Sequence, residues 1–555
     1  VAGLPLAVRG KLYNCAAVCQ SGRLMGLVPK THLPSYNEFY EGRRFTAAPA
    51  GNFTLEVLGQ TVPFGTKLLF CHPKADCFKI AVEICEDVWA PLPPSVGHAM
   101  AGATLILNLS ASDEVVGKAE YRRQLIAGQS ARLLCGYLYA DAGRGESTTD
   151  LVFAGHDLIC ENGAILAQTE LFGSGMIVSE VDLEKLAGER LKNTSFAAVN
   201  DEGYTTVQLA DTCADWQPVR PVDPAPFVPA GESERMRRCE AILEMQAQGL
   251  RKRMEHTHAA TAVIGISGGL DSTLALLVVT RAFRLMNKPL KDVVAVTMPC
   301  FGTTQRTKSN AEKLCEALGV SLRQVNIADT VRSNFADIGH DESVLDVTYE
   351  NTQARVRTLV LMNLANRLGG LVIGTGDLSE LALGWATYNG DHMSMYGVNG
   401  SVPKTLVRHI VATVAANSEP ALREVLQDIL DTPVSPELLP AKENGEIAQQ
   451  TEAIVGPYEL HDFFLYYAIR WGFAPKKIFW LARRAFAGGY EDAVLVQWLR
   501  NFYRRFFAQQ FKRSCLPDGP KVGTVTLSPR GDWRMPSDAC ATLWLAQVEE
   551  LEQNL

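Results

Sequence analysis

The sequence predicts an α/β protein built from two domains, and three observations lead to this expectation. With 555 residues, the chain is too long for one hydrophobic core. After residue 260, strand-like apolar runs alternate with helical ones, the pattern of a doubly wound parallel sheet. Five prolines between residues 216 and 231 exclude a helix or a central strand there. We therefore expect a first domain at 1–190, a linker at 191–231 and a second domain, with a C-terminal tail, at 232–555.

The individual elements follow from local patterns. Short β-rich runs bounded by loops predict strands in the first domain at residues 12–19, 24–28, 79–84, 103–109, 136–140 and 177–181. A charged amphipathic stretch predicts a helix over 233–256. Apolar runs predict the strands of the second domain at 262–266, 293–298, 322–327 and 371–374.

Composition limits the classes of function. The net charge of -8 argues against a general nucleic-acid binder, and no apolar stretch reaches membrane-spanning length. The 13 cysteines are scattered without a CxxC pair, which predicts reduced thiols and a cytoplasmic protein. The first residues read like the middle of a domain, so we expect a segment before Val1 to be missing.

The stretch around residue 267 carries the strongest motif. A strand, a glycine turn and a helix start bring free N–H groups and the positive helix end to one point, which favours an anion. Ser-Gly-Gly-Leu-Asp-Ser at 267–272 resembles the pyrophosphate loop of the ATP pyrophosphatase superfamily, which adenylates substrates. An ordinary turn is the alternative. The resemblance implies ATP contacts from Gly265, Ile266, Ser267, Gly268, Gly269, Leu270, Asp271 and Ser272.

Cys85 marks a second candidate site. It ends a strand beside two carboxylates, the position of a nucleophile, although a lone cysteine is more often a small core residue. Lys30 directly follows another strand. Together with the segment 108–122, these residues resemble the nitrilase superfamily in its glutamine-amidase form, which implies an αββα sandwich, here truncated, and a Glu-Lys-Cys triad.

The same resemblance assigns roles. Cys85 matches the nucleophile and Lys30 the oxyanion-stabilising lysine, while Glu41 could be a supporting second glutamate. The general-base glutamate of that family lies upstream of Val1, so we expect either a truncated sequence or an impaired amidase. Residues where such domains hold glutamine are Tyr36, Ser112 and Lys118.

Further polar residues follow the strands of the second domain. Arg306 and Lys308 could reach phosphates or could be solvated loop cations. Thr375 can face ATP at a strand end, where ligands of such sheets bind. Glu380 is placed to share Mg²⁺ with Asp271, although a glutamate here is more often a helix-start residue.

A Gly- and Asn-rich stretch with aromatic residues, at 388–403, predicts a mobile lid that carries Lys404 to the α-phosphate. Combined with the amidase-then-pyrophosphatase order, the chain resembles the glutamine-dependent NAD synthetases. Lys404 would then act in catalysis. The resemblance implies deamido-NAD contacts from Asn351, Glu380, Trp385, Ala386, Thr387, Tyr388 and Lys512.

The implied activity is ATP-dependent amidation of deamido-NAD with ammonia from glutamine, in a homo-oligomer that uses Mg²⁺. Two alternatives stay open. One is another glutamine-fed adenylating enzyme such as a GMP synthetase, whose amidase uses a cysteine–histidine pair; no histidine in 1–190 is convincingly paired with Cys85. The other is an ammonia-dependent synthetase in which the first domain is an inactive oligomerisation scaffold.

Overall fold

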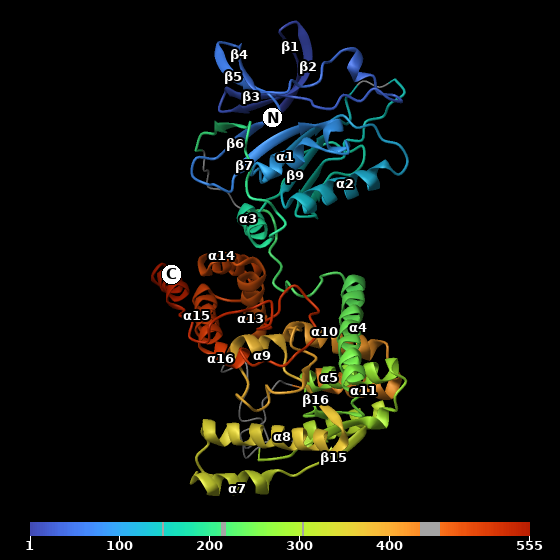
Figure 1. The fold of residues 1–555 in the computed structure, drawn as a ribbon, viewed down its shortest axis with the longest axis vertical. Coiled ribbons are helices and arrows are strands. Elements are labelled where there is room, and N and C mark those ends of the chain that lie inside the picture. The colour runs from blue at the N-terminus through green and yellow to red at the C-terminus, as the bar shows by residue number, and fades with distance from the viewer. Residues whose placement is uncertain (147–148, 212–217, 302–304, 433–454) are drawn as a thin grey trace. The chain divides into compact units, whose positions relative to one another are not determined.

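The computed structural model describes residues 1–146, 149–211, 218–301, 305–432 and 455–555, with side chains undescribed at 305–308 (Figure 1). The chain divides into two compact units, Val1–Pro221 and Val222–Leu555. Within the described residues, no helix combines the length and apolarity needed to cross a membrane.

The first unit contains two β-sheets. The five-stranded sheet has the order β1-β2-β3-β5-β4, formed by Ala2–Val8, Lys11–Gln20, Arg23–Pro29, Gln60–Phe64 and Phe53–Val57 in that order. The mixed seven-stranded sheet has the order β11-β10-β9-β8-β7-β6-β12, formed by Ala164–Gln168, Leu158–Glu161, Gly136–Asp141, Leu105–Ser110, Lys79–Ile84, Leu68–Cys71 and Thr205–Gln208. The helices are η1 (Glu41–Arg43), η2 (Cys85–Val88), α1 (Pro94–Met100), α2 (Lys118–Leu133) and α3 (Leu183–Lys192).

The two sheets of this unit stack through apolar side chains. Val18 and Val28 of the five-stranded sheet share one buried cluster with Phe70 and Val82 of the seven-stranded sheet. The other face of the larger sheet is packed by α1 and α2 in a second cluster. Because β7, β8 and β9 are parallel neighbours, their carboxyl ends lie together at one edge.

The second unit is a parallel sheet with helices on both faces. Its strand order is β15-β14-β13-β16-β17, from Ser321–Gln324, Val293–Thr297, Thr261–Gly265, Gly370–Gly374 and Tyr396–Gly397. One face packs against helices α4 (Glu232–Thr257), α5 (Leu270–Leu285), α6 (Gln305–Leu318), α10 (Lys404–Ala416) and α11 (Pro420–Leu430). The other packs against α7 (Ala328–Ile338) and α8 (Val347–Leu368). A short helix, η3 (Leu290–Asp292), precedes β14.

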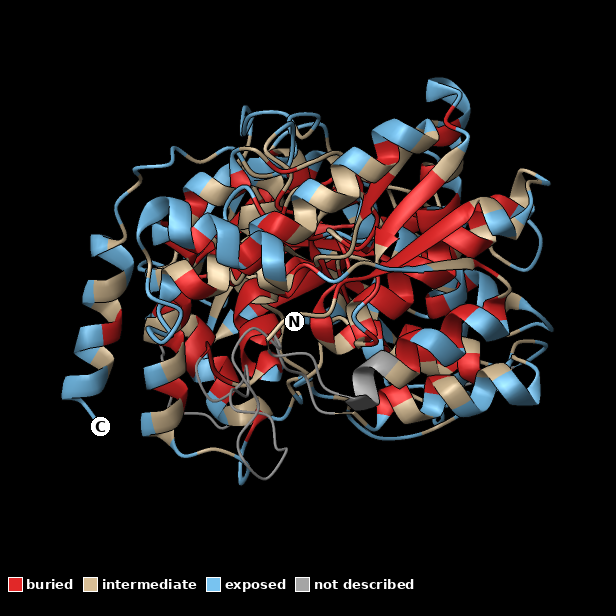
Figure 2. Ribbon diagram, turned by 90° about the horizontal axis from the view of Figure 1, so that it is seen from below, coloured by how far each residue is buried: buried red, intermediate tan, exposed pale blue. Residues whose placement is uncertain are grey.

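A helical cluster completes this unit. It contains α9 (Leu378–Leu383), α13 (Tyr458–Leu465), η4 (Tyr466–Trp471), α14 (Pro475–Ala485), α15 (Asp492–Ala508), α16 (Gln510–Arg513) and α17 (Thr542–Gln553). Strands β13 and β14 are largely buried, and Figure 2 shows central strands in the buried colour, whereas many helices carry both buried and exposed residues, as amphipathic helices on a core do.

The predicted α/β class is confirmed, with differences in detail. Residues 177–181 form no strand; the Glu180 carboxylate instead accepts hydrogen bonds from the N–H groups of Val219 (2.6 Å) and Arg220 (2.7 Å). Within the segment expected to be a linker, β12 pairs with β6 at the edge of the large sheet. Part of the chain after residue 190 therefore folds with the first unit.

Candidate active sites of the two units

Cys85 lies on a sharp turn at the end of β7. Its φ of +46° is in the left-handed region, which is uncommon for a side chain other than glycine. Hydrogen bonds hold the turn from both sides: the Ile84 N–H donates to Asp87 Oδ2 (2.9 Å), and the Cys85 N–H donates to Asn108 Oδ1 (3.2 Å). The predicted nucleophile position therefore has the geometry of an elbow.

Asp87 also holds the loop that follows Lys30. Its Oδ1 accepts a hydrogen bond from the His32 N–H at 2.8 Å. Lys30 itself is 3% exposed, and its Nζ lies 2.5 Å from Glu41 Oε2. This role of Asp87 was not predicted, because a carboxylate three residues after a strand indicates only a helix start.

The residues predicted for glutamine chemistry come together in one cleft. It has a volume of about 930 Å³, and its lining includes all five of them: Lys30, Tyr36, Cys85, Ser112 and Lys118. Glu41, the suggested second glutamate, lines it too.

Ion pairs and hydrogen bonds hold the polar wall of this cleft. The Lys118 ammonium pairs with Asp113, and the Tyr36 hydroxyl donates to Glu86 Oε1 (2.8 Å). Fully buried Arg122 donates to Ser112 Oγ (3.2 Å), a support for which the sequence carries no local signal.

Opposing effects act on the pKa of the Cys85 thiol. Burial raises the pKa of its thiol, whereas the positive charge of Lys30 and contacts from Ala111 N–H and the Ser110 hydroxyl lower it. The net direction is upward, so the thiol is predominantly protonated and needs a base to become a nucleophile.

In the second unit, the phosphate loop joins β13 to α5. Gly268 has a φ of +85°, and Gly269 is the residue before the helix. Ser267 and Ser272 contact each other through their hydroxyl oxygens at 3.1 Å. The side chains of Ile266 and Leu270 belong to the apolar core, so only the backbone of these two predicted ATP contacts can face a ligand.

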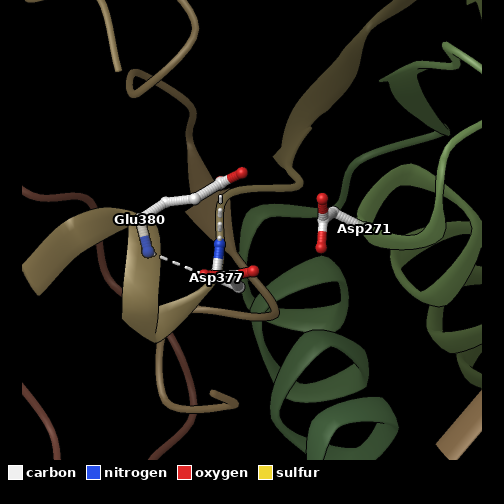
Figure 3. A group of neighbouring side chains, drawn as sticks. All are labelled: Asp271, Asp377 and Glu380. Atoms are coloured by element: carbon white, nitrogen blue, oxygen red, sulfur yellow. Dashed lines mark hydrogen bonds between the residues drawn. The ribbon is translucent and has the colours of Figure 1, made fainter. Parts of the chain in front are cut away.

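Three carboxylates gather next to this loop (Figure 3). Asp271 is in the first turn of α5, while Asp377 and Glu380 form the capping box of α9. One oxygen from each lies within 4.8 Å of the others. The predicted pair Asp271 and Glu380 is therefore brought together, and Asp377 joins it. The Asp-x-x-Glu spacing could have indicated Asp377, but it predicted only a helix start.

Lys404, the first residue of α10, is inserted among these carboxylates. Its Nζ lies 2.7 Å from Asp271, 2.7 Å from Asp377 and 3.0 Å from Glu380. Burial alone would lower the pKa of Lys404, but the three carboxylates together raise it well above its usual value. Burial raises the pKa of Glu380 to about 7, against the attraction of Lys404.

The donor set is suited to a divalent cation. Three carboxylates and one ammonium leave two negative charges uncompensated when all are ionised. Among the described residues, Asp271 Oδ1 has no hydrogen-bond partner although it is buried. Oxygen donors of this kind are those that Mg²⁺ prefers.

The residues predicted to contact deamido-NAD form a connected group. The Thr387 hydroxyl donates to Asn351 Oδ1 (2.7 Å). Lys512 Nζ donates to the carbonyls of Gly384 (2.8 Å) and Ala386 (2.6 Å) and so holds the segment after α9. Two residues outside this group contact its aromatic rings: Arg505 lies over Trp385, and Phe511 packs against Tyr388. Glu380 lines a neighbouring cavity of about 100 Å³ together with Thr375.

Comparison with known proteins gives a family match within each of the two units. Residues 1–190 match the carbon-nitrogen hydrolase family and residues 242–468 the NAD synthase family. The chain is 44% identical to the glutamine-dependent NAD(+) synthetase of Mycobacterium tuberculosis H37Rv, over 99% of this chain and 86% of that protein. The chain belongs to the glutamine-dependent NAD(+) synthetase family. The family's synthetase of Thermotoga maritima is 29% identical, over 94% of this chain and 82% of that protein. A solved synthetase from Cytophaga hutchinsonii is 20% identical, with a TM-score of 0.48 over 99% of this chain and 86% of that one.

The structure corrects the second half of the lid that was expected at 388–403. Tyr388 is 44% exposed, but Tyr396 and Gly397 form the edge strand β17, and Val398, Asn399 and Val402 are fully buried. The Asn399 amide donates to the carbonyls of Asp271 (2.9 Å) and Thr375 (3.0 Å). The second half of this stretch is thus part of the sheet and its core, and Lys404 is in the site already. The side chains of Arg306 and Lys308 lie outside the described residues.

Proposed function

We propose that this chain converts deamido-NAD, ATP, glutamine and water into NAD, AMP, pyrophosphate and glutamate. The observation that carries the proposal is the presence, in one chain, of a thiol–lysine cleft and of a phosphate loop beside a carboxylate–lysine cluster. We assign glutamine hydrolysis to residues 1–190 and amidation to residues 232–555, with 191–231 between them.

In the cleft, a base takes the proton of the Cys85 thiol, and the thiolate attacks the carbonyl carbon of the glutamine amide. The Lys30 ammonium stabilises the oxyanion that forms, the proton passes from the base to the amide nitrogen, and ammonia leaves to give a thioester. Water then hydrolyses the thioester to glutamate and restores the Cys85 thiol. Tyr36, Ser112 and Lys118 hold the glutamine; Ser112 and Lys118 are themselves held by Arg122 and Asp113.

In the second unit, ATP lies along the loop from Gly265 to Ser272 and against Thr375. The nicotinate carboxylate of deamido-NAD attacks the α-phosphate, pyrophosphate leaves, and ammonia then displaces AMP from the acyl-adenylate. Lys404 stabilises the charge that develops on the phosphate. Asn351, Glu380, the segment from Trp385 to Tyr388, and Lys512 hold the dinucleotide; their mutual hydrogen bonds support this assignment.

Asp271, Asp377 and Glu380 would hold Mg²⁺, which supplies charge neutralisation for the ATP phosphates when bound. We also propose a cytoplasmic homo-oligomer. None of the twelve described cysteines forms a disulfide, which suits a reducing compartment. Exposed apolar residues such as Val116 and Tyr121 suit a subunit contact.

Isotope transfer tests the reaction. With deamido-NAD labelled by ¹⁸O in its carboxylate and glutamine labelled by ¹⁵N in its amide, we expect one ¹⁸O in AMP and ¹⁵N in the NAD amide. Label in orthophosphate instead of AMP would refute attack at the α-phosphate. Synthesis from ammonium chloride but never from glutamine would support the scaffold alternative for the first unit.

A further inference from the structure

A chain of buried hydrogen bonds runs from the Cys85 elbow into the sheet. The Cys85 N–H (3.2 Å) and the Ser110 hydroxyl (2.8 Å) both donate to Asn108 Oδ1. At its other end, Asn108 Nδ2 donates to the Tyr137 hydroxyl (3.1 Å), which donates to Glu83 Oε1. Glu83, Asn108 and Tyr137 come from the adjacent strands β7, β8 and β9.

A contribution to folding stability does not explain this series of buried hydrogen bonds. Glu83 and Asn108 are each 1% exposed and Tyr137 is 0% exposed, so these polar groups are removed from water. Well-packed apolar residues of similar size would avoid that desolvation. A buried polar network is, however, able to specify one local geometry.

The network has a direction. The Glu83 carboxylate accepts from the Tyr137 hydroxyl at Oε1 and from the Ser95 N–H at Oε2 (2.8 Å). Because the Tyr137 hydroxyl donates its proton to Glu83, its oxygen can only accept a hydrogen bond from Asn108. The group of Asn108 that faces Tyr137 must therefore be the NH₂ donor. The oxygen of the amide must then face Cys85. Without this orientation, the amide could turn its own donors toward the Cys85 N–H, which would oppose the elbow.

We propose that Asn108 is a positioning residue for the amidase reaction, oriented by Tyr137 and Glu83, and that it holds the left-handed turn from which the Cys85 thiol reaches the cleft. This inference rests on the proposed function of Cys85. It has a second consequence: because the Cys85 N–H is engaged by Asn108, it is unavailable to the oxyanion, and that role falls to Lys30.

Graded substitutions test the inference. Asn108→Leu keeps the size but removes the acceptor, and we expect kcat for glutamine hydrolysis to fall about 100-fold, the scale for a misplaced reacting group, with KM changed less than about 3-fold. Asn108→Asp keeps an acceptor for Cys85 and should recover at least about a tenth of the parent kcat. Tyr137→Phe should fall between these two.

Tyr204→Phe is the matched control, since it removes another hydroxyl of this unit, the one that contacts His98 (3.0 Å). Parent kcat in both Tyr137→Phe and Asn108→Leu would overturn the inference. The inference would also be overturned if the loss of kcat were proportional to the fall in Tm to the same degree in the Asn108 and Tyr137 variants and in the Tyr204→Phe control. If Asn108→Leu does not fold, the conservative Tyr137→Phe and Asn108→Asp variants still decide.

The failure of the proposed function looks different. Glutamine-dependent synthesis that persists in Cys85→Ala would remove Cys85 from the reaction altogether. Parent activity in the Asn108 and Tyr137 variants, combined with an inactive Cys85→Ala, would refute only the positioning role. Ammonium-dependent synthesis should be unchanged in all of these variants.

Discussion

Replacing Lys404 by methionine removes the ammonium that lies among Asp271, Asp377 and Glu380. Two unit charges 4.8 Å apart, the span of this cluster, repel by about 3.5 kcal/mol at an effective dielectric constant of 20. Removing one partner of a buried ion pair typically costs about 3–5 kcal/mol. We therefore expect Lys404→Met to lower the free energy of unfolding of the second unit by about 3–5 kcal/mol in EDTA.

Magnesium should reverse much of this loss. If the three carboxylates bind Mg²⁺, the ion replaces the missing positive charge, and at 100 times its dissociation constant it restores about 2.7 kcal/mol. Urea unfolding followed by tryptophan fluorescence measures this, because all tryptophans except Trp89 and Trp216 lie in the second unit. Lys404→Arg is the control that keeps the charge.

Two results would refute this reasoning. An equal loss of stability in EDTA and in Mg²⁺ would exclude a cation site at these carboxylates. A loss below about 1 kcal/mol in EDTA, the range of surface pairs, would mean that Lys404 does not neutralise the cluster. In single-turnover assays, adenylation by Lys404→Met should be slower by about 10²–10³-fold at saturating ATP, as for loss of one charge-stabilising donor.

Four further outcomes are expected. Cys85→Ala should lose synthesis from glutamine but keep synthesis from ammonium, measured as NAD formed. Lys512→Met, which frees the carbonyls of Gly384 and Ala386, should raise KM for deamido-NAD more than KM for ATP. Burial lowers the pKa of His98 and of His461 to about 4. Below about pH 6.5, the unfolded chain binds protons at these histidines that the folded chain does not bind. The free energy of unfolding therefore has its full value above that pH and falls toward pH 4, by about 3 kcal/mol per histidine. In urea unfolding at a series of pH values, His98→Gln and His461→Gln should flatten this dependence. EDTA should stop NAD synthesis but leave glutamine hydrolysis measurable by glutamate release.

The structural features that could be predicted from the sequence are those that depend on short local patterns of residues. The strand–glycine–helix pattern predicted the phosphate loop, strand ends singled out Cys85 and Lys30, and the resemblance to the nitrilase superfamily joined these two in one site, which the structure has as one cleft. Asp87 and Asp377 were missed because their sequence positions indicate only helix starts, whereas their partners come from distant residues such as His32 and Lys404. The lid prediction was wrong for the second half of its stretch for the same reason: glycine and asparagine suggest mobility, but Asn399 is buried and hydrogen-bonded to two distant carbonyls.

Each candidate site contains a buried lysine, but the negative charge beside that lysine differs between the sites. This difference in charge distinguishes the chemistry expected at each site. Among the described residues, Lys30 pairs with the carboxylate of Glu41, so this pair is neutral and needs no cation from solution. A neutral pair leaves its ammonium able to respond to a negative charge that forms nearby, as an amide carbonyl becomes an oxyanion. Lys404 contacts three carboxylates and leaves an excess of negative charge. Triphosphate would be repelled from such a cluster unless a divalent cation accompanies it, so we expect any requirement for Mg²⁺ to arise at the proposed adenylating site.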